Sequence, residues 1–273
     1  MPDPQSSTIQ STAQAAGELI ADSVAFRFAQ FALSPISLKA RAGELTAIIG
    51  PNGSGKSTLL EILSGHLKPK AGGVFLDGQN LHALSPRERA RKVGLARQDT
   101  ILLFSFEVQE FVRQGRHPHL GNSLFESPED DRWVAWALEK TCLQEFAHRR
   151  VMEMSSGEFQ RAVLARTLAQ RPRLVLLDEP TANLDIGYQV EIFRLLRQLA
   201  KSENFVGIVV THELNLAAEM ADYVVLLQGG NCLHQGKAED VFRADLLSRA
   251  FRTPVLVDQN PSSGRPRVTW VAP

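Results

Sequence analysis

Long hydrophobic runs are absent from this chain of 273 residues. No stretch approaches the roughly 18–20 apolar residues that a transmembrane helix needs, and the amino terminus lacks the basic and then apolar order of a signal peptide. These absences predict a soluble, cytoplasmic protein without a membrane span of its own. They leave open that the protein docks on a membrane protein.

The chain has no excess of positive or negative charge, and it has only two cysteines. Lys and Arg together number 30, as do Asp and Glu, so the net charge is zero and the pI is about 7.1. This balance gives no global positive potential for nucleic acid, and we expect no nucleic-acid partner. Cys142 and Cys232 lie far apart without a CxxC spacing, which favours reduced, packed thiols.

What the sequence does contain is an alternation of short apolar strands with helices. Residues 45–49 and 174–177 are apolar without alternation, as expected for central strands buried on both faces. Strand–helix order at both ends of the chain implies parallel strands with helices on both faces. Residues 107–150 are instead predicted to be mostly helical. Further strands are expected at 24–28, 36–40, 74–76, 93–96, 206–210 and 224–227, and helices at 56–67, 158–169, 188–201 and 214–220.

The first central strand leads into a glycine-rich loop that fits the phosphate-loop pattern fully, with a helix after it. Glycines let backbone N–H groups surround an anion, and the helix N-terminus adds its dipole. Lys56 is placed to reach the β- and γ-phosphates, and Ser57 to ligate Mg²⁺. The loop consists of Gly50, Pro51, Asn52, Gly53, Ser54, Gly55, Lys56, Ser57 and Thr58.

The strand at residues 174–177 ends in two adjacent acids. Asp178 is placed to hold Mg²⁺, through water, and Glu179 to polarise the attacking water. A polar turn, Met154–Glu158, opens another helix and offers backbone N–H groups to a phosphate. A site that splits water needs both the metal carboxylate and the base, so their adjacency favours nucleotide hydrolysis.

Six motifs, taken in their order along the chain, resemble those of the ATP-binding subunits of ABC transporters. The phosphate loop matches their Walker A motif, and residues 174–179 match Walker B with the catalytic glutamate. Met154–Glu158, here named the signature segment, matches the family signature, and residues 181–185 match the D-loop. Gln98 matches the Q-loop glutamine and His212 the switch histidine. The resemblance covers roughly residues 20–240.

The resemblance implies an α/β fold: a P-loop NTPase (RecA-like) core with a mixed sheet, an antiparallel β edge and an inserted α-helical subdomain at about residues 99–157. The ATPase domain would span residues 19–240. Residues 1–18, rich in Ser, Gln, Ala and Thr, are expected to be a disordered tail. Residues 241–273 would form a C-terminal helix and a short tail.

The resemblance also assigns roles to single residues. Ser155 and Gly157 would contact the γ-phosphate held by a second copy of the chain, and Asp185 would communicate across that dimer. Gln98 would sense Mg²⁺ and the γ-phosphate, and His212 would hold the γ-phosphate and the attacking water in position. The catalytic set is Lys56, Gln98, Glu179 and His212; the metal set is Ser57, Gln98 and Asp178; Ser155, Gly157, Glu158 and Asp185 complete the nucleotide site.

An aromatic ring is expected to stack on adenine. The resemblance places it at Phe28, where the family usually has tyrosine, and Phe26 is an alternative because the strand-to-loop spacing is short. The departures from the family pattern, Met154, Ser156 and Arg97, remove no catalytic group. An active ATPase is therefore expected.

The stretch Gly115-Arg-His-Pro-His119 resembles one found in subunits that import iron-siderophore, haem or cobalamin. His117 and His119 within it are expected to cap or pack rather than to bind a metal, because no third ligand is evident nearby. Three nearby phenylalanines either form a groove for a coupling helix of a membrane subunit or belong to the core. They are Phe104, Phe106 and Phe111.

Together these features predict the ATP-hydrolysing subunit of an ABC importer for iron-siderophore, haem or cobalamin, with ATP and Mg²⁺ as cofactors. The expected partners are a second copy in a head-to-tail ATP sandwich, transmembrane permease subunits and, indirectly, a substrate-binding protein. The expected location is the cytoplasmic face of the inner membrane. The alternatives are the ATPase of another ABC importer and a soluble ABC ATPase that acts as a conformational switch without transport.

Overall fold

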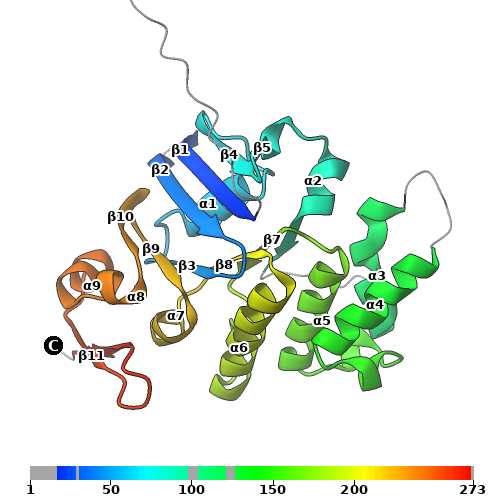
Figure 1. Ribbon diagram of the computed structural model, residues 1–273. Coiled ribbons are helices and arrows are strands. Elements are labelled where there is room, and N and C mark those ends of the chain that lie inside the picture. The colour runs from blue at the N-terminus through cyan, green and yellow to red at the C-terminus, as the bar shows by residue number, and fades with distance from the viewer. Residues whose placement is uncertain (1–16, 29–30, 98–103, 121–126, 272–273) are drawn as a thin grey trace, which may run out of the picture.

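The computed structural model describes residues 17–28, 31–97, 104–120 and 127–271. Its core is a six-stranded sheet (Figure 1), and this sheet is mixed, as the resemblance implies. Five neighbouring strands run parallel, and β10 pairs antiparallel with β9 at one edge. The strand order is β10 (Asn231–Gly236), β9 (Tyr223–Gln228), β3 (Leu45–Ile49), β8 (Val206–Val210), β7 (Leu174–Asp178) and β6 (Val93–Ala96).

The central strands are buried on both faces, which explains why their apolar residues do not alternate with polar ones. Successive side chains of a strand point to opposite faces. Ile48 and Leu176 therefore join one hydrophobic cluster, and their neighbours Ile49 and Val175 join the other. Since each face has its own apolar layer, nearly every position in these strands is apolar, and Thr46 in β3 is a buried exception.

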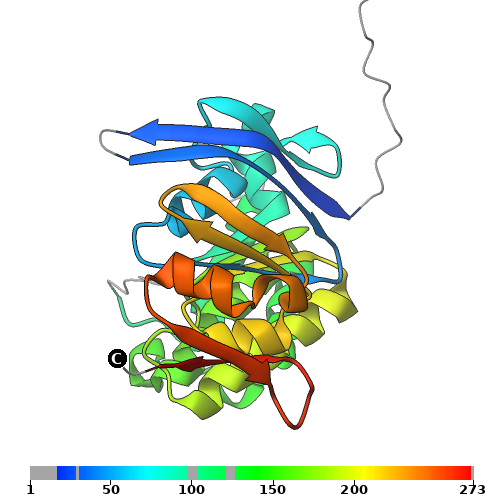
Figure 2. The same cartoon turned by 90° about the vertical axis from the view of Figure 1, so that its left-hand side faces the viewer.

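A second, antiparallel sheet and one helix cover the first face of the central sheet. This sheet has the order β2 (Phe31–Arg41), β1 (Glu18–Phe28), β4 (Ala71–Leu76) and β5 (Gln79–Asn80). Its inward residues share a cluster with those of α1 (Lys56–Leu63) and the central strands. Figure 2 shows this sheet as a separate layer above the central one. The expected tail of residues 1–18 overlaps the described chain at Gly17, which hydrogen-bonds Asp77, and at Glu18, which begins β1 and is buried beside Lys39.

Helices cover the opposite face of the central sheet. The apolar residues of α6 (Ile186–Glu203), α7 (Leu214–Met220), α8 (Ala238–Val241) and α9 (Ala244–Phe251) pack there against the sheet. A separate group of helices forms the side of the molecule away from β10 (Figure 1). Between β6 and β7 the chain forms the helical subdomain, seen in green in Figure 1. Its elements are α3 (Val108–Arg113), η2 (Gln114–His119), α4 (Pro128–Lys140), η3 (Gln144–Phe146), η4 (Val151–Glu153) and α5 (Ser156–Ala169).

The C-terminal segment differs from the expected helix and short tail. The helix is present as α9, but the tail forms a hairpin of β11 (Val255–Gln259) and β12 (Pro266–Trp270). The Asn215 side chain of α7 fastens this hairpin, because its amide accepts from the Val268 N–H at 2.7 Å and donates to the Val268 carbonyl at 3.2 Å. Two five-residue strands that bury little have too weak a pattern to stand out in the sequence.

Two shorter elements complete the fold. The turn η1 (Leu81–Ala83) and the helix α2 (Pro86–Lys92) follow β5. No residue of α2 is buried. None of the helices among the described residues is long and apolar enough to span a membrane.

Candidate functional site

The phosphate loop connects the carboxyl end of β3 to the N-terminus of α1, and its glycines are required by its surroundings. Gly55 caps α1 with φ 101°, a left-handed conformation that glycine adopts without strain. A Cβ at Gly55 would also lie 2.9 Å from the side chains of Leu33 and Phe31. A Cβ at Gly50 would overlap the carbonyl of Leu227 in β9. The loop is thus packed tightly between the two sheets.

Lys56 lies buried at the first position of α1. Its ammonium donates to the carbonyls of Gly50 at 2.9 Å and Pro51 at 3.1 Å, both within its own loop. Burial lowers the pKa of the Lys56 ammonium, and the carboxylates of Glu179 and Asp178 oppose this shift. A phosphate in the loop would replace the two carbonyls as the partner of this buried charge.

The acidic pair at the end of β7 faces the start of α1. The Ser57 hydroxyl lies 3.5 Å from the Asp178 carboxylate, so two of the three expected metal ligands are neighbours. Burial raises the pKa of the Asp178 carboxyl; the hydrogen bond from Ser57 opposes this, whereas the charge of Glu179 adds to it. A hydroxyl and a carboxylate oxygen are donors that suit a hard cation such as Mg²⁺.

Glu179 is held by His212, which lies two residues after the end of β8. The Nε2 of His212 lies 2.5 Å from the Glu179 carboxylate. Glu179 also has φ 49°, a conformation that non-glycine residues adopt rarely, and its N–H donates to the Val210 carbonyl at 3.0 Å. The structure therefore brings Glu179 and His212 together and fixes the backbone of the expected base.

A pocket of about 340 Å³ lies over the phosphate loop, lined by loop residues, Glu179 and Phe31. Sequence reasoning missed Phe31, which opposes Phe28 across the β1–β2 pair. Phe28 is 72% exposed. Phe26, the alternative, is partly buried against the hydrophobic cluster beneath the antiparallel sheet. Of the two expected adenine contacts, only Phe28 therefore presents an exposed ring.

The signature segment lies elsewhere, at the N-terminus of α5. No residue of Met154–Glu158 lines the pocket over the phosphate loop, although all five are described. Ser155 and Glu158 form a capping box: the Glu158 N–H donates to the Ser155 hydroxyl at 3.3 Å, and the Ser155 N–H donates to the Glu158 carboxylate at 2.8 Å. The Ser155 side chain is exposed, so a ligand from outside the chain can reach it.

Two further expected residues lie near these elements. Asp185 is the exposed N-cap residue of α6, directly after the segment expected to be the D-loop. Gln98 lies outside the described residues, so its expected contact with Mg²⁺ and the γ-phosphate remains a prediction. Its neighbour Arg97 ion-pairs with Glu61 of α1 at 2.7 Å.

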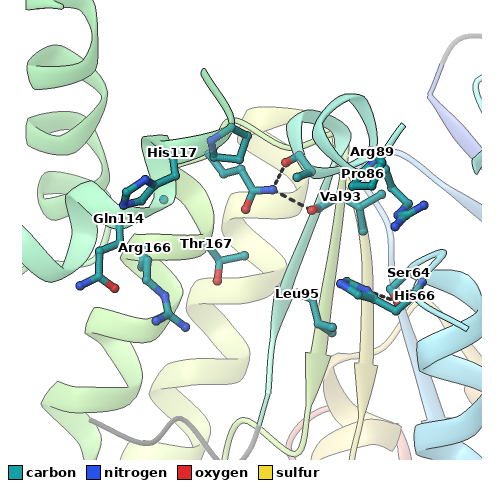
Figure 3. Close-up of a pocket in the computed structure, with 14 residues that line it drawn as sticks. Ser64, His66, Pro86, Arg89, Val93, Leu95, Gln114, His117, Arg166 and Thr167 are labelled. Atoms are coloured by element: carbon teal, nitrogen blue, oxygen red, sulfur yellow. Dashed lines mark hydrogen bonds between the residues drawn. The ribbon is translucent and has the colours of Figure 1, made fainter. Parts of the chain in front are cut away.

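A second hollow, of about 610 Å³, lies between the core and the helical subdomain (Figure 3). The end of α1, α2 and β6 form one wall, and η2 and α5 form the other. Arg89, Arg166, His66 and His117 face it, and no acidic residue is among the described residues that line it. Its lining residues are Ser64, His66, Pro86, Arg89, Ala90, Val93, Leu95, Gln114, Gly115, His117, Pro118, Arg166, Thr167 and Gln170.

The Gly115–His119 stretch joins three helices beside this hollow. Arg116 pairs with Asp130 of α4 at 2.8 Å and donates to the Ala169 carbonyl of α5 at 2.7 Å, with both charged side chains buried. The Pro118 carbonyl accepts from two arginines of α2. His119 hydrogen-bonds the Gln170 carbonyl at 2.8 Å, which is the packing role expected for it.

The three phenylalanines on which the sequence left two readings open behave differently. Phe111 is 1% exposed and lies in the core, and Phe106 is partly buried against it. Phe104 is 69% exposed and meets Phe106 edge to face at 6.2 Å. None of the three lines the hollow of Figure 3. The core reading is therefore confirmed for Phe111 alone.

A phosphate loop after a central parallel strand, with an acidic pair from another strand beside it, defines a P-loop nucleoside triphosphatase. The comparisons place the chain more narrowly. A family model described as ABC transporter matches residues 33–182. The chain belongs to the ABC transporter family, and its fold is that of an ATP-binding cassette.

Curated relatives share more than a third of the aligned residues. The chain is 38% identical over 237 residues to the cobalamin import ATP-binding protein BtuD of Halobacterium salinarum, covering 87% of this chain but 59% of that protein. It is 39% identical to the hemin import ATP-binding protein HmuV of Escherichia coli O157:H7, over 85% and 91% of the two chains. It is 36% identical to the iron(3+)-hydroxamate import ATP-binding protein FhuC of Bacillus subtilis, over 82% and 83%.

Solved structures agree with this placement. One chain of a structure described as an inward-facing conformation of a metal-chelate type ABC transporter superposes with a TM-score of 0.83 at 26% identity, covering 94% of this chain and 98% of that one. An ATP-binding cassette in a dimeric, post-hydrolysis state with ADP and phosphate superposes with a TM-score of 0.68 at 28% identity, covering 81% and 98%.

Proposed function

We propose that this chain hydrolyses ATP, with Mg²⁺, to drive an ABC importer of an iron-siderophore, haem or corrinoid. The observation that carries the proposal is the separation of the two phosphate-binding elements. The pocket over the phosphate loop holds Lys56 and Glu179 but no residue of the signature segment, whose Ser155 is exposed. Two copies joined head to tail would complete each other's sites, and a similar cassette is known as a dimer.

Within each composite site, the roles follow from the geometry. Lys56 and the loop N–H groups would bind the phosphates, while Ser57 and Asp178 would hold Mg²⁺. Glu179 would accept a proton from the attacking water, and His212 would keep its carboxylate in place through the 2.5 Å contact. Ser155 and Gly157 of the second copy would bind the γ-phosphate from the other side. Phe28, with its exposed ring, would stack on adenine.

We propose further that the hollow of Figure 3 receives a permease subunit, which would hold the chain at the cytoplasmic face of the membrane. The three similar proteins are named for import of different cargoes, cobalamin, hemin and ferric hydroxamate. Since no cargo contacts this subunit in the proposal, the cargo follows from the permease and substrate-binding protein with which it assembles.

ATPase measurements on the purified chain test the proposal. We expect Mg²⁺-dependent hydrolysis that Lys56→Ala abolishes. Vesicles containing the chain with its permease should take up vitamin B12, ferric hydroxamate or hemin when ATP is supplied. A chain that hydrolyses no ATP would overturn the enzyme assignment. An active chain that binds no polytopic membrane protein would instead favour a conformational switch without transport.

A further inference from the structure

The ring of Tyr188, in the first turn of α6, lies against Gly157 of the signature segment. A Cβ at Gly157 would lie 2.5, 2.8 and 2.9 Å from the Cδ1, Cγ and Cε1 atoms of the Tyr188 ring. Distances below 3.0 Å are essentially never seen for a real Cβ, so only glycine fits against this ring. Gly157 is buried in the single chain, whereas Ser155 and Ser156 beside it are exposed.

The position of the ring changes the reason for glycine at 157. A glycine that faces a nucleotide could be needed to leave room for that nucleotide. Here the space in the direction of the Cβ is taken by a side chain of the same protein. The glycine is therefore required by the contact of the start of α5 with the Tyr188 ring.

The same helical turn reaches two other motifs through Gln189. Its side-chain amide donates to the Leu184 carbonyl at 3.1 Å and lies 3.5 Å from the Thr181 carbonyl, both in the segment that resembles the D-loop. The amide also lies 3.5 Å from the carboxylate of Glu213, which directly follows His212. One turn of α6 thus contacts the signature segment, the D-loop segment and the residue next to the switch histidine.

We propose that Tyr188 is a positioning residue for ATP hydrolysis: its ring fixes the signature segment through Gly157 relative to the D-loop and to His212. The inference rests on the proposed function, because it assigns the Tyr188–Gly157 contact to the half of the site that a second copy completes. Tyr188 does not touch the nucleotide in this scheme. It acts by holding the Ser155 hydroxyl and the N–H groups of α5 where the γ-phosphate of the other copy arrives.

The test is to create a steric conflict at residue 157 and then to remove it by a second substitution. Gly157→Ala should lower kcat by about 100-fold, as expected when a catalytic group is misplaced by about an ångström. Tyr188→Ala alone should lower kcat about tenfold, because the segment loses its support. The double variant Gly157→Ala/Tyr188→Ala should regain the rate of Tyr188→Ala, since the added methyl group then has space. Tyr188→Phe keeps the ring and should retain the wild-type rate.

A matched control and a binding measurement separate positioning from folding. Gly187 lies in the same turn of α6, and nothing lies within 4 Å of a Cβ built there, so Gly187→Ala should hydrolyse ATP like the wild type. In all these variants the affinity of the single chain for ATP, measured by fluorescence with a nucleotide analogue, should be unchanged. A positioning role lowers kcat and leaves that affinity intact, whereas a folding defect lowers both.

Two results would overturn the inference. A double variant as inactive as Gly157→Ala would mean that the glycine leaves room for the second copy's nucleotide. A Tyr188→Ala variant with the wild-type rate would exclude the positioning role even if Gly157→Ala fails to fold. An inactive wild-type chain would instead count against the proposed function itself, so the two failures can be told apart.

Discussion

The two halves of the proposed ATP site are built differently. The phosphate loop is embedded between the two sheets: Lys56 is 6% exposed, Gly55 lies against β2, and Gly50 lies against β9. The signature segment projects from the helical subdomain, with Ser155 and Ser156 exposed, and is held by its own capping box and by Tyr188. The first half is complete in one chain, whereas in the proposed dimer the second would act on the nucleotide of the other copy.

The largest effect is expected at Glu179, in the embedded half. Glu179→Gln removes the proton acceptor but keeps the shape and the contact with His212. We expect kcat to fall by about 10³-fold, within the range for loss of a general base. ATP should still bind and should now accumulate a stable dimer, visible as a doubled mass in light scattering. An ATP-bound variant that stays monomeric would contradict the composite site.

The buried ion pair of the helical subdomain should have the largest effect on stability. Arg116→Met leaves the Asp130 carboxylate buried without its cation, which typically costs about 3–5 kcal/mol. Urea unfolding followed by circular dichroism measures this loss. The double variant Arg116→Met/Asp130→Asn should recover part of it, because no unpaired charge then remains. Equal stability of the wild type and Arg116→Met would show that the pair does not hold the subdomain.

The same pair predicts a pH dependence. Burial alone would raise the pKa of the Asp130 carboxyl, but hydrogen bonds from Ser127 and Arg116 outweigh it and lower that pKa to about 2 from the ordinary 3.8. A lowered pKa means that the ionised form stabilises the folded state. Its contribution is therefore fully present above pH 3.8 and is lost as the pH falls towards 2. In a plot of the free energy of unfolding against pH, the Asp130→Asn variant should therefore not show this loss of stability at acidic pH.

The embedded half was the easier one to predict from the sequence. The strands at 45–49, 93–96 and 206–210 have the predicted bounds, because a parallel strand buried on both faces must be a continuous apolar run. The phosphate loop and the acidic pair follow directly from such strands. Helix α1 ends at Leu63, earlier than the expected residue 67, because Gly65, with φ 77°, follows its C-cap residue Ser64.

Tertiary contacts of the projecting half could not be read from the sequence. The pattern gives the signature segment as a helix start, but nothing in it pairs Gly157 with Tyr188, 31 positions further along the chain. Likewise Phe31 enters the pocket over the phosphate loop only because β1 and β2 pair in one register. The roles of these residues depend on which elements lie side by side, and short-range patterns carry no record of that.

Separate effects on ATP binding and dimer formation are expected from variants in the two halves. In the Glu179→Gln background, Ser155→Arg should leave ATP binding to the single chain unchanged and weaken the ATP-dependent dimer by about 100-fold, since a bulky side chain would fill the contact with the second copy. Lys56→Ala should abolish ATP binding itself. Light scattering and nucleotide fluorescence give the two readouts. Loss of nucleotide binding by Ser155→Arg would place the signature segment in the site of its own chain.

The smallest effect is expected at Glu158, the other member of the capping box. Glu158→Ala frees the Ser155 N–H and should cost about 1 kcal/mol of stability. Glu158→Gln retains an acceptor for that N–H and loses only the 3.5 Å pair with Arg149, so it should lie closer to the wild type. Hydrogen bonds from Ser155 lower the pKa of the Glu158 carboxyl, so this stabilisation should weaken on acidification. If Glu158→Ala lowers kcat while urea unfolding is unchanged, the box serves to aim the Ser155 hydroxyl rather than to stabilise α5.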